Sequence, residues 1–378
     1  WANKFRRTRN CILSLKTDFG SPAPVYLIDG VFLAPNMASG SVSVRRGVTL
    51  TLACPQRTVA INGTSNFCSQ DAKCVSGSTF SVGRWTGEMN QLNCTGNPVY
   101  TVLETTRPCY RGGYIVKVGY TVRDKLHVLY SACFGRGTLS TRYVRHELTP
   151  ASVHGQSTPR PQFNGGALFG KVRVDKLYKT KYEKQRLDEL LGPDSAQKYF
   201  SKDQYLTRGH LAAKADFSLS ALQRATFHFV NVAPQWMRGN RGDWAALEEA
   251  LRRRVKASNA TVTVYTGTHG VLALPGTQVT KELYLYTDEN NNLAVPVPLY
   301  FYKLVHDPHR RSATAFLTIN SSFFNATTTE ALTFCEDVCD SAPWLTWRND
   351  MTHSFCCSYD EFRKVIDHVP SLDIVGLY

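Results

Sequence analysis

The chain has 378 residues, with 44 Lys and Arg against 30 Asp and Glu, so its formal net charge is +14 at pH 7. Hydrophobic residues make up 43% and charged residues 20%, a composition that excludes a wholly disordered chain. The most apolar stretch, residues 293–305, contains two prolines and a lysine and is too short to span a bilayer. We therefore expect one large or two medium globular domains and no membrane partner.

The first part of the chain, residues 1–145, has the pattern of a β-rich segment. Residues 39–54 (SGSVSVRRGVTLTLAC) alternate apolar and polar side chains on either side of a glycine, as strands with one buried face do. Residues 112–134 have the pattern of a hairpin with its turn at 123–125. We predict a mainly β region here without a long helix.

Cysteine usage points to an oxidising compartment. No cysteine lies between Cys133 and Cys335, so the 11 cysteines fall into two groups. Five N-glycosylation sequons begin at Asn62, Asn93, Asn259, Asn320 and Asn325. Together these features predict a secreted, disulfide-bonded glycoprotein with one cysteine left over.

The C-terminal cysteines allow two interpretations. Because the long cysteine-free stretch separates them from the rest, we expect them to pair among themselves. The alternative is a zinc site that also uses His353, although adjacent cysteines are poor joint ligands for one tetrahedral ion. The four cysteines are Cys335, Cys339, Cys356 and Cys357.

The positive charge is uneven along the chain. Residues 1–150 carry 18 Lys and Arg against 7 Asp and Glu, whereas residues 151–378 carry 26 against 23. A basic soluble surface explains this as well as attraction of a polyanion does, since neutralised phosphates release counterions. Charge alone leaves both explanations open.

A Pro- and Gly-rich connection at residues 152–166 marks a change in pattern. We place the domain boundary shortly before it, with a cysteine-rich, basic, mainly β domain at 1–140 and a second domain at 141–378. In the second domain, residues 179–192 predict a short helix that ends at a glycine. Residues 243–257 (DWAALEEALRRRVKA) predict the strongest helix, because acidic residues come early and basic residues late.

Strands are predicted after that helix. Residues 260–272 (ATVTVYTGTHGVL) have the pattern of a central strand, and residues 297–320 that of two strands around a turn at 307–308. The second domain is therefore mixed α and β.

One set of polar residues in the second domain does not fit a purely structural reading. Arg208-Gly-His210 is followed by Asn231-Val-Ala-Pro-Gln235, by Asn240 and then by Trp244-Ala-Ala-Leu-Glu248, with Arg252 four residues further. Positions four apart share a helix face, so the amide, the carboxylate and the guanidinium can point the same way. The helix alone could be a solvated face with an ion pair, but that reading leaves the histidine motif unexplained.

Hydrolysis of a phosphodiester needs these residue types. A neutral imidazole can take a proton from water near neutral pH. Mg²⁺ prefers oxygen ligands and keeps most of its waters, so an Asn oxygen and a carboxylate can hold it. Arginine clamps the non-bridging phosphate oxygens.

The joint pattern resembles the DNA/RNA non-specific endonucleases, which are ββα-metal nucleases, and most closely their secreted arthropod members. The resemblance covers residues 140–378 and implies an α+β, ββα-metal nuclease domain with a mixed or antiparallel sheet, preceded here by the disulfide-rich β domain. The departure is Thr207, where most members have Asp, so no effect of that acid on the pKa of the histidine is carried over.

The resemblance also implies roles for individual residues. His210 would be the general base, Asn240 the direct Mg²⁺ ligand and Glu248 the acceptor for a water on the metal. Arg160, in the segment STPRPQF, would clamp phosphate. The supporting residues would be Arg208, Asn231, Gln235 and Arg252.

The function implied is that of a secreted, Mg²⁺-dependent, sequence-independent endonuclease that leaves 5′-phosphate products, with Mn²⁺ or Ca²⁺ as possible substitutes for Mg²⁺. Its substrate would be nucleic acid, with duplex DNA preferred over RNA. The protein would be a monomer. The alternative is a catalytically weak secreted protein that binds nucleic acid or heparin.

Overall fold

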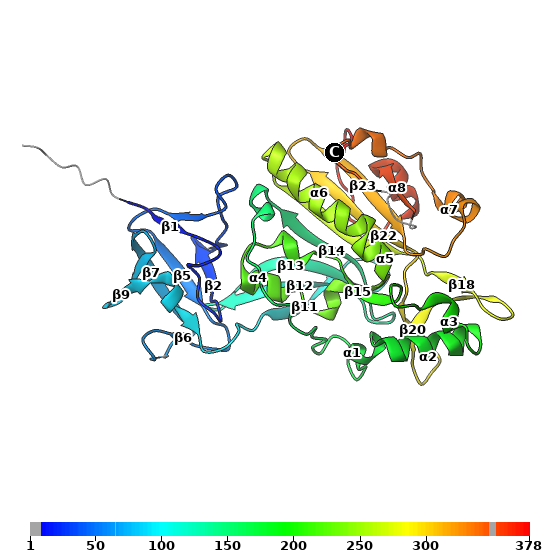
Figure 1. Ribbon diagram of the computed structural model, residues 1–378, viewed down its shortest axis with the longest axis horizontal. Coiled ribbons are helices and arrows are strands. Elements are labelled where there is room, and N and C mark those ends of the chain that lie inside the picture. Colours follow the sequence, from blue (N-terminus) through cyan, green and yellow to red (C-terminus); the bar gives the residue numbers. More distant parts are fainter. Residues whose placement is uncertain (1–8, 65, 348–352) are drawn as a thin grey trace, which may run out of the picture.

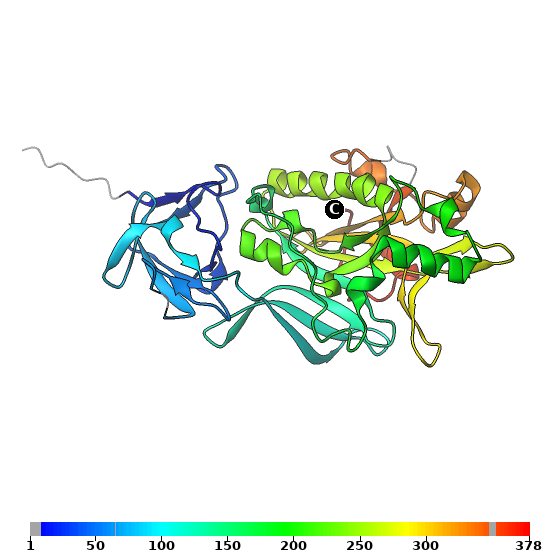
Figure 2. The ribbon, with the colours of Figure 1, turned by 60° about the horizontal axis from the view of Figure 1, so that its bottom comes forward.

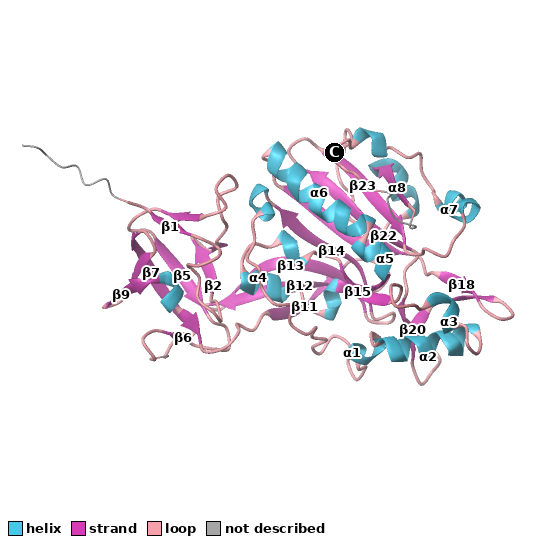
Figure 3. Ribbon diagram, in the orientation of Figure 1, coloured by secondary structure: helices cyan, strands magenta, loops and turns pink. Residues whose placement is uncertain are grey.

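The computed structural model describes residues 9–64, 66–347 and 353–378. Two bodies follow one another along the chain, a smaller one made mostly of strands and a larger one that mixes strands and helices (Figure 1, Figure 3). The predicted α+β architecture, with a β-rich region before the nuclease-like region, is confirmed. None of the described helices is long and apolar enough to cross a membrane.

The smaller body is built around a six-stranded sheet. Its strand order is β3 (Val31–Phe32), β2 (Val25–Ile28), β5 (Thr49–Ala53), β7 (Ser69–Ser76), β8 (Thr79–Val82) and β9 (Trp85–Glu88). Two short pairs accompany it, β1 (Cys11–Leu13) with β4 (Val42–Val44) and β6 (Val59–Ala60) with β10 (Asn93–Cys94). The disulfides Cys11–Cys74 and Cys54–Cys94 tie the short pairs into this body.

The larger body contains an eight-stranded antiparallel sheet. In spatial order its strands are β11 (Thr101–Pro108), β12 (Tyr114–Val122), β13 (Lys125–Gly135), β14 (Ser140–Leu148), β17 (Val262–His269), β22 (Tyr300–Asp307), β23 (Ser312–Ile319) and β24 (Ser354–Ser358). The smaller pairs are β15 (Leu206–His210) with β16 (Val232–Trp236), β18 (Ala273–Pro275) with β19 (Thr280–Glu282), and β20 (Tyr284–Thr287) with β21 (Leu293–Pro296).

This sheet disagrees with the boundary expected at residue 140, which falls at the start of β14. Strands β11–β14 bond into the same sheet as β17, where Tyr143 lies opposite Gly267. A boundary at 140 would therefore separate three strands, β11–β13, from the sheet to which they are hydrogen-bonded. We propose instead that the two bodies join at residues 95–100, between β10 and β11.

Helices pack around the large sheet. Their bounds are α1 (Val174–Leu177), α2 (Thr180–Leu191), α3 (Ala196–Tyr199), α4 (Ser220–Ala225), α5 (Met237–Arg241), α6 (Asp243–Ser258), α7 (Ala326–Leu332) and α8 (Tyr359–Val365). The longest of them, α6, lies across one face of the sheet (Figure 1, Figure 2). The predicted helices at 179–192 and 243–257 correspond to α2 and α6, and Gly242 is the N-cap of α6.

The disulfides confirm the expected grouping of cysteines. Cys335 pairs with Cys357 and Cys339 with Cys356, whereas Cys109, just after β11, pairs with Cys133 in β13. The leftover cysteine is Cys68, which is exposed.

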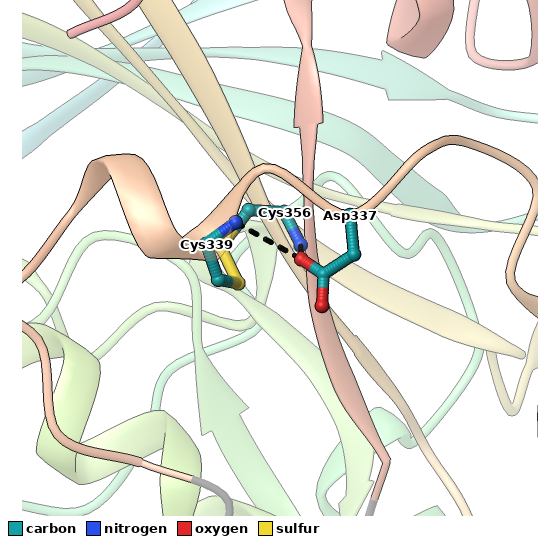
Figure 4. A group of neighbouring side chains, drawn as sticks. All are labelled: Asp337, Cys339 and Cys356. Atoms are coloured by element: carbon teal, nitrogen blue, oxygen red, sulfur yellow. Dashed lines mark hydrogen bonds between the residues drawn. A yellow bond between two sulfur atoms is a disulfide. The ribbon is translucent and has the colours of Figure 1, made fainter.

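The alternative of a zinc site among the C-terminal cysteines is wrong, because all four sulfur atoms are used in disulfides. Asp337 lies beside the Cys339–Cys356 bridge, and its Oδ1 accepts hydrogen bonds from the two cysteine backbone N–H groups at 3.0 and 3.1 Å (Figure 4). The carboxylate therefore holds the backbone on both sides of a disulfide.

The five sequon asparagines differ in their surroundings. Asn320 is buried, its Nδ2 donates to the carbonyls of Pro234 and Pro298, and its Oδ1 accepts from the backbone N–H of Trp236. A glycan at Asn320 is incompatible with this fold, since the amide joins three segments of the backbone. Asn62, Asn259 and Asn325 are exposed, so glycosylation there stays a prediction.

Candidate active site

The histidine motif lies on a two-stranded hairpin that leads into the long helix. Strands β15 and β16 are antiparallel, with His210 opposite Val232 and Thr207 opposite Gln235. Helices α5 and α6 follow β16 directly, which gives the order strand, strand, helix that the resemblance implies. The hairpin places His210 at the C-terminal end of β15.

Buried Asn231 fixes the chain just after His210. Its Oδ1 accepts from the backbone N–H of Ala212 at 2.8 Å, and its Nδ2 donates to the carbonyls of Ala212 and Thr226 at 2.9 and 3.0 Å. All the hydrogen bonds of this side-chain amide are therefore made to backbone groups. Asn231 therefore positions the histidine strand and does not reach the pocket.

His210 is held between aromatic rings. The rings of Phe163 and Phe227 lie 5.0 and 4.9 Å from it, centroid to centroid. Its Nε2 is buried and has no hydrogen-bond partner among the described residues. Burial, followed by the positive charge of Arg160, lowers the pKa of His210 to about 3. The imidazole is therefore neutral at neutral pH, and one ring nitrogen is free to accept a proton.

Asn240 comes from the short helix α5. Its Nδ2 donates to the hydroxyl of Thr207 at 2.8 Å, and that hydroxyl donates to the carbonyl of Gln235 at 2.7 Å. The bond fixes the orientation of the amide and leaves Asn240 Oδ1 without a partner among the described residues. An amide oxygen held in this way suits a hard divalent cation.

Glu248 lies on α6, across from a buried lysine. Lys303 Nζ is 3.7 Å from Glu248 Oε1, and the side chain of Lys303 is 1% exposed. The lysine also donates to the carbonyl of Leu211 at 3.2 Å and to the hydroxyl of Thr266 at 2.9 Å. It thus links the residue after His210 to the carboxylate of Glu248.

Burial raises the pKa of Glu248 to about 7, against the opposing effect of the Lys303 charge. Burial likewise lowers the pKa of Lys303. A cation bound beside this carboxylate would favour its charged form. The donor set of an amide oxygen and a carboxylate therefore fits a divalent ion such as Mg²⁺ better than a soft metal.

One pocket of about 750 Å³ brings five of the eight predicted residues together. The five that line it are Arg160, Arg208, His210, Asn240 and Glu248. Arg208 packs its guanidinium against three aromatic rings, at 5.8 Å from the centroids of Phe163 and Tyr178 and 5.9 Å from that of Phe229. The pocket is therefore lined by two guanidinium groups, by a neutral imidazole and by the side-chain oxygens of Asn240 and Glu248.

Three predicted residues lie elsewhere. Asn231 and Gln235 are buried, at 0% and 1% exposed. Arg252 does not line the pocket, and its guanidinium donates to Asp216 at 2.8 Å. The expectation that Asn240, Glu248 and Arg252 share one helix face is wrong, because the helix is broken at Gly242, so Asn240 belongs to α5.

Asp216 holds the Arg252 side chain away from the pocket by an ion pair. It accepts from Arg252 and also contacts His146 Nε2 at 2.9 Å. Burial would raise the pKa of Asp216, but these two partners hold it at about 2. This ionised aspartate anchors α6 to β14 behind the pocket.

Three further residues line the pocket or contact the predicted ones, and sequence patterns did not assign them a role. Lys303 interrupts an apolar strand, and the pattern YFYKLVHD does not tell a buried lysine from one that points to solvent. Lys214 also lines the pocket, four residues after the histidine. Thr207 was taken as a departure from the pattern, whereas its hydroxyl orients Asn240. A search for polar residues in otherwise apolar strands would have found Lys303.

The Thr207 hydroxyl gives a testable consequence. We expect Thr207→Val to lower the rate and to raise the metal concentration needed for half-maximal activity, because the isosteric methyl group cannot bond the Asn240 amide. The expected loss is ~10-fold, the lower end for residues that orient a metal ligand. Thr207→Ser keeps the hydroxyl and should behave like the wild type. An unchanged metal midpoint in Thr207→Val would show that this bond does not orient the ligand.

Comparisons with known proteins show the family to which this chain belongs. Residues 111–358 match the model of the DNA/RNA non-specific endonuclease family. A salivary endonuclease of Lutzomyia longipalpis is 30% identical over 381 aligned residues, covering 96% of this chain and 85% of that protein. Salivary protein Tsal2A of Glossina morsitans morsitans is 24% identical, covering 77% of this chain and 74% of that protein. A chain of the crystal structure of the EndoG/EndoGI complex is 18% identical, with a TM-score of 0.41, and covers 67% of this chain and 89% of that chain.

Proposed function

Because this chain belongs to the DNA/RNA non-specific endonuclease family, we propose that it is a secreted, Mg²⁺-dependent endonuclease that cuts DNA, and RNA as a second substrate, to 5′-phosphate products. The observation that carries the proposal is the free Nε2 of a neutral His210 in one pocket with Asn240, Glu248 and two arginines. Five disulfides and salivary relatives support secretion.

The proposed roles follow from the proton that His210 can accept and from the negative charge that the arginines can stabilise. His210 Nε2 accepts a proton from a water, and the hydroxide attacks phosphorus opposite the 3′ oxygen. The P–O3′ bond breaks, the phosphate stays on the 5′ side, and the 3′ oxygen takes a proton from solvent. Arg160 and Arg208 hold the non-bridging oxygens, which gain negative charge during attack.

Asn240 would hold Mg²⁺ through its free amide oxygen, and Glu248 would hold it through a water. When bound, the ion neutralises charge on the phosphate and on the leaving oxygen. Lys303 keeps the Glu248 carboxylate in place and offsets part of its charge. The phenyl rings around His210 keep bulk water from protonating it.

Base-specific contacts are not required by this chemistry. The five pocket residues act on phosphate, sugar-phosphate oxygens or water, and backbone contacts carry no sequence information. We therefore expect little sequence preference in the cut sites.

Metal removal tests the proposal. Plasmid DNA should be degraded in Mg²⁺ and remain intact in excess EDTA, and the fragments should be substrates for ligase without prior phosphorylation, since their ends are 5′-phosphate and 3′-hydroxyl. Cutting that persists in EDTA, or fragments that need phosphorylation before ligation, would contradict the mechanism. Salt-sensitive retention on heparin without any cutting would favour the alternative of a binding protein.

A further inference from the structure

A second pocket, of about 240 Å³, lies where the N-terminal body meets the nuclease body. One wall comes from Ser21, Pro22 and Ala23 of the smaller body and from Asn97 and Pro98 of the connection. The facing wall is on the nuclease side and is lined by residues before and within α4, which lies at the junction in Figure 1. We call this space the junction pocket.

The junction pocket adjoins the active-site pocket. Lys214 lines both of them. Phe227 lines the junction pocket, and its ring lies 4.9 Å from the His210 ring and 5.2 Å from the Arg160 guanidinium carbon. A single phenyl ring therefore stands between the proposed base and the junction pocket.

Three basic side chains that lack an acidic partner among the described residues line the junction pocket, the active-site pocket or both. Within the described ranges, Arg160, Lys214 and Arg224 form no ion pair with a carboxylate. The Lys214 ammonium donates to the carbonyl of Thr158 at 2.6 Å. None of the described residues that line the junction pocket is acidic. Neighbouring cations repel one another, so their unpaired grouping favours an anion between them.

The size of the junction pocket limits what can enter it. At ~30 Å³ per water, 240 Å³ corresponds to about eight waters, which is room for one phosphate with part of its sugar or base and far too little for a duplex. Its lining combines a lysine and an arginine with Ser, Thr and Asn side chains and with proline, alanine and phenylalanine side chains. The two cations and the hydroxyl and amide groups suit a phosphodiester group, and the apolar side chains suit its sugar or base.

We propose that the junction pocket binds a second phosphate of the strand that is being cut, several atoms away from the scissile bond. Arg224 and Lys214 supply the charge, and Asn97 contributes the wall from the N-terminal side. The proposal rests on the proposed function, since the first phosphate must occupy the active-site pocket. It gives the N-terminal body a role in holding substrate that the nuclease body lacks when alone.

A length series tests this subsite. The full-length protein is assayed for kcat/KM on two single-stranded substrates, a dinucleotide with a single phosphodiester group and a 12-mer, as the wild type and as Arg224→Gln, Asn97→Asp and Arg173→Gln. All three substitutions lower the net charge by one. Arg173 is the matched control, because it is exposed and paired with Asp175, outside both pockets.

We expect Arg224→Gln and Asn97→Asp to cut the 12-mer at least fivefold less efficiently than the control does, while the dinucleotide, which has no second phosphate, is cut equally well by all variants. The salt dependence on the 12-mer should also become shallower for Arg224→Gln, by about 0.7 in the slope of log kcat/KM against log salt, for one lost phosphate contact. Asn97 is exposed, so its variant serves if Arg224→Gln folds poorly.

Two outcomes would overturn the subsite. Variants of Arg224 and Asn97 that match Arg173→Gln on both substrates would show that no phosphate binds there. An equal loss on both substrates would place Arg224 at the scissile phosphate instead. Failure of the wild type to cut either oligonucleotide in Mg²⁺ would contradict the nuclease proposal itself, which keeps the two failures apart.

Discussion

Replacing His210 by Ala should reduce the rate of phosphodiester cleavage by ~10²–10⁴-fold, the usual contribution of a positioned general base. The reason is that no other neutral imidazole lines the pocket among the described residues. Binding of duplex DNA in EDTA should change little, because affinity comes from arginines and lysines that the substitution does not touch. The measurement is a single-turnover rate on a labelled duplex together with an equilibrium binding curve.

His309→Ala is the matched control for this variant. His309 is exposed on the turn between β22 and β23 and does not line the active-site pocket. The control should retain the wild-type rate. If His210→Ala kept more than about half of that rate, the assignment of the base would be wrong.

The second large effect concerns the metal. Asn240→Ala and Glu248→Gln should each lower the rate and raise the Mg²⁺ midpoint, by ~10–100-fold where the lost group orients the ion through a water. The Mg²⁺ affinity should fall in parallel when it is measured by calorimetry without substrate. A rate defect with an unchanged metal midpoint and unchanged calorimetric affinity in both variants would place the metal elsewhere.

Glu249→Gln is the neighbouring control, because Glu249 is exposed and pairs with Arg253 on the same helix. Glu248→Gln needs a check on folding, since it leaves the buried Lys303 ammonium without its carboxylate. Removing one partner of a buried pair can cost ~3–5 kcal/mol. The lysine keeps its bonds to Leu211 and Thr266, so we expect a lower melting temperature but a folded protein.

The free histidine has a consequence for pH dependence. With a pKa near 3, His210 stays unprotonated as pH falls through the ordinary histidine range near 6.5. Protonation of His210 in the free enzyme therefore does not limit kcat/KM until the pH is well below that range. Phosphate bound nearby would raise the histidine pKa, so the acid limb of kcat should lie at higher pH than that of kcat/KM.

Much of the fold follows from local sequence patterns. Helix α6 was predicted nearly to the residue, because the order of acidic and then basic side chains and the apolar spacing agree. The hairpin of β12 and β13 was found from its alternation and its turn at Arg123 and Asp124. Grouping by sequence distance also predicted that the four C-terminal cysteines pair among themselves, although not which cysteine pairs with which.

The boundary that we propose at residues 95–100 differs from the one expected at residue 140 for a physical reason. Strands β11–β14 have the same alternating pattern as the strands before them, and nothing local shows that β14 pairs with β17 more than 100 residues later. Sheet membership is decided by such long-range pairing. The local pattern of a hairpin therefore does not show whether its strands belong to the smaller body or to the larger one.

Five of the eight predicted site residues line one pocket, and their roles stay predictions. The spacing from Asn231 to Glu248 could not show the break at Gly242 that separates Asn240 from α6. The spacing also could not show that Arg252 pairs with Asp216, or that Lys303, from a distant strand, lies beside Glu248. Contacts between distant strands and a helix are set by packing, which short motifs do not encode.

The measurement that tests the central claim most directly is chemical rescue of His210→Gly by free imidazole. The rings of Phe163 and Phe227 flank the space that the side chain leaves, and they should accept a planar heterocycle. The account predicts that imidazole restores metal-dependent cutting in proportion to its unprotonated concentration, with no effect on the wild type. A variant that binds duplex DNA normally but gains nothing from imidazole at any pH would contradict His210 as the base.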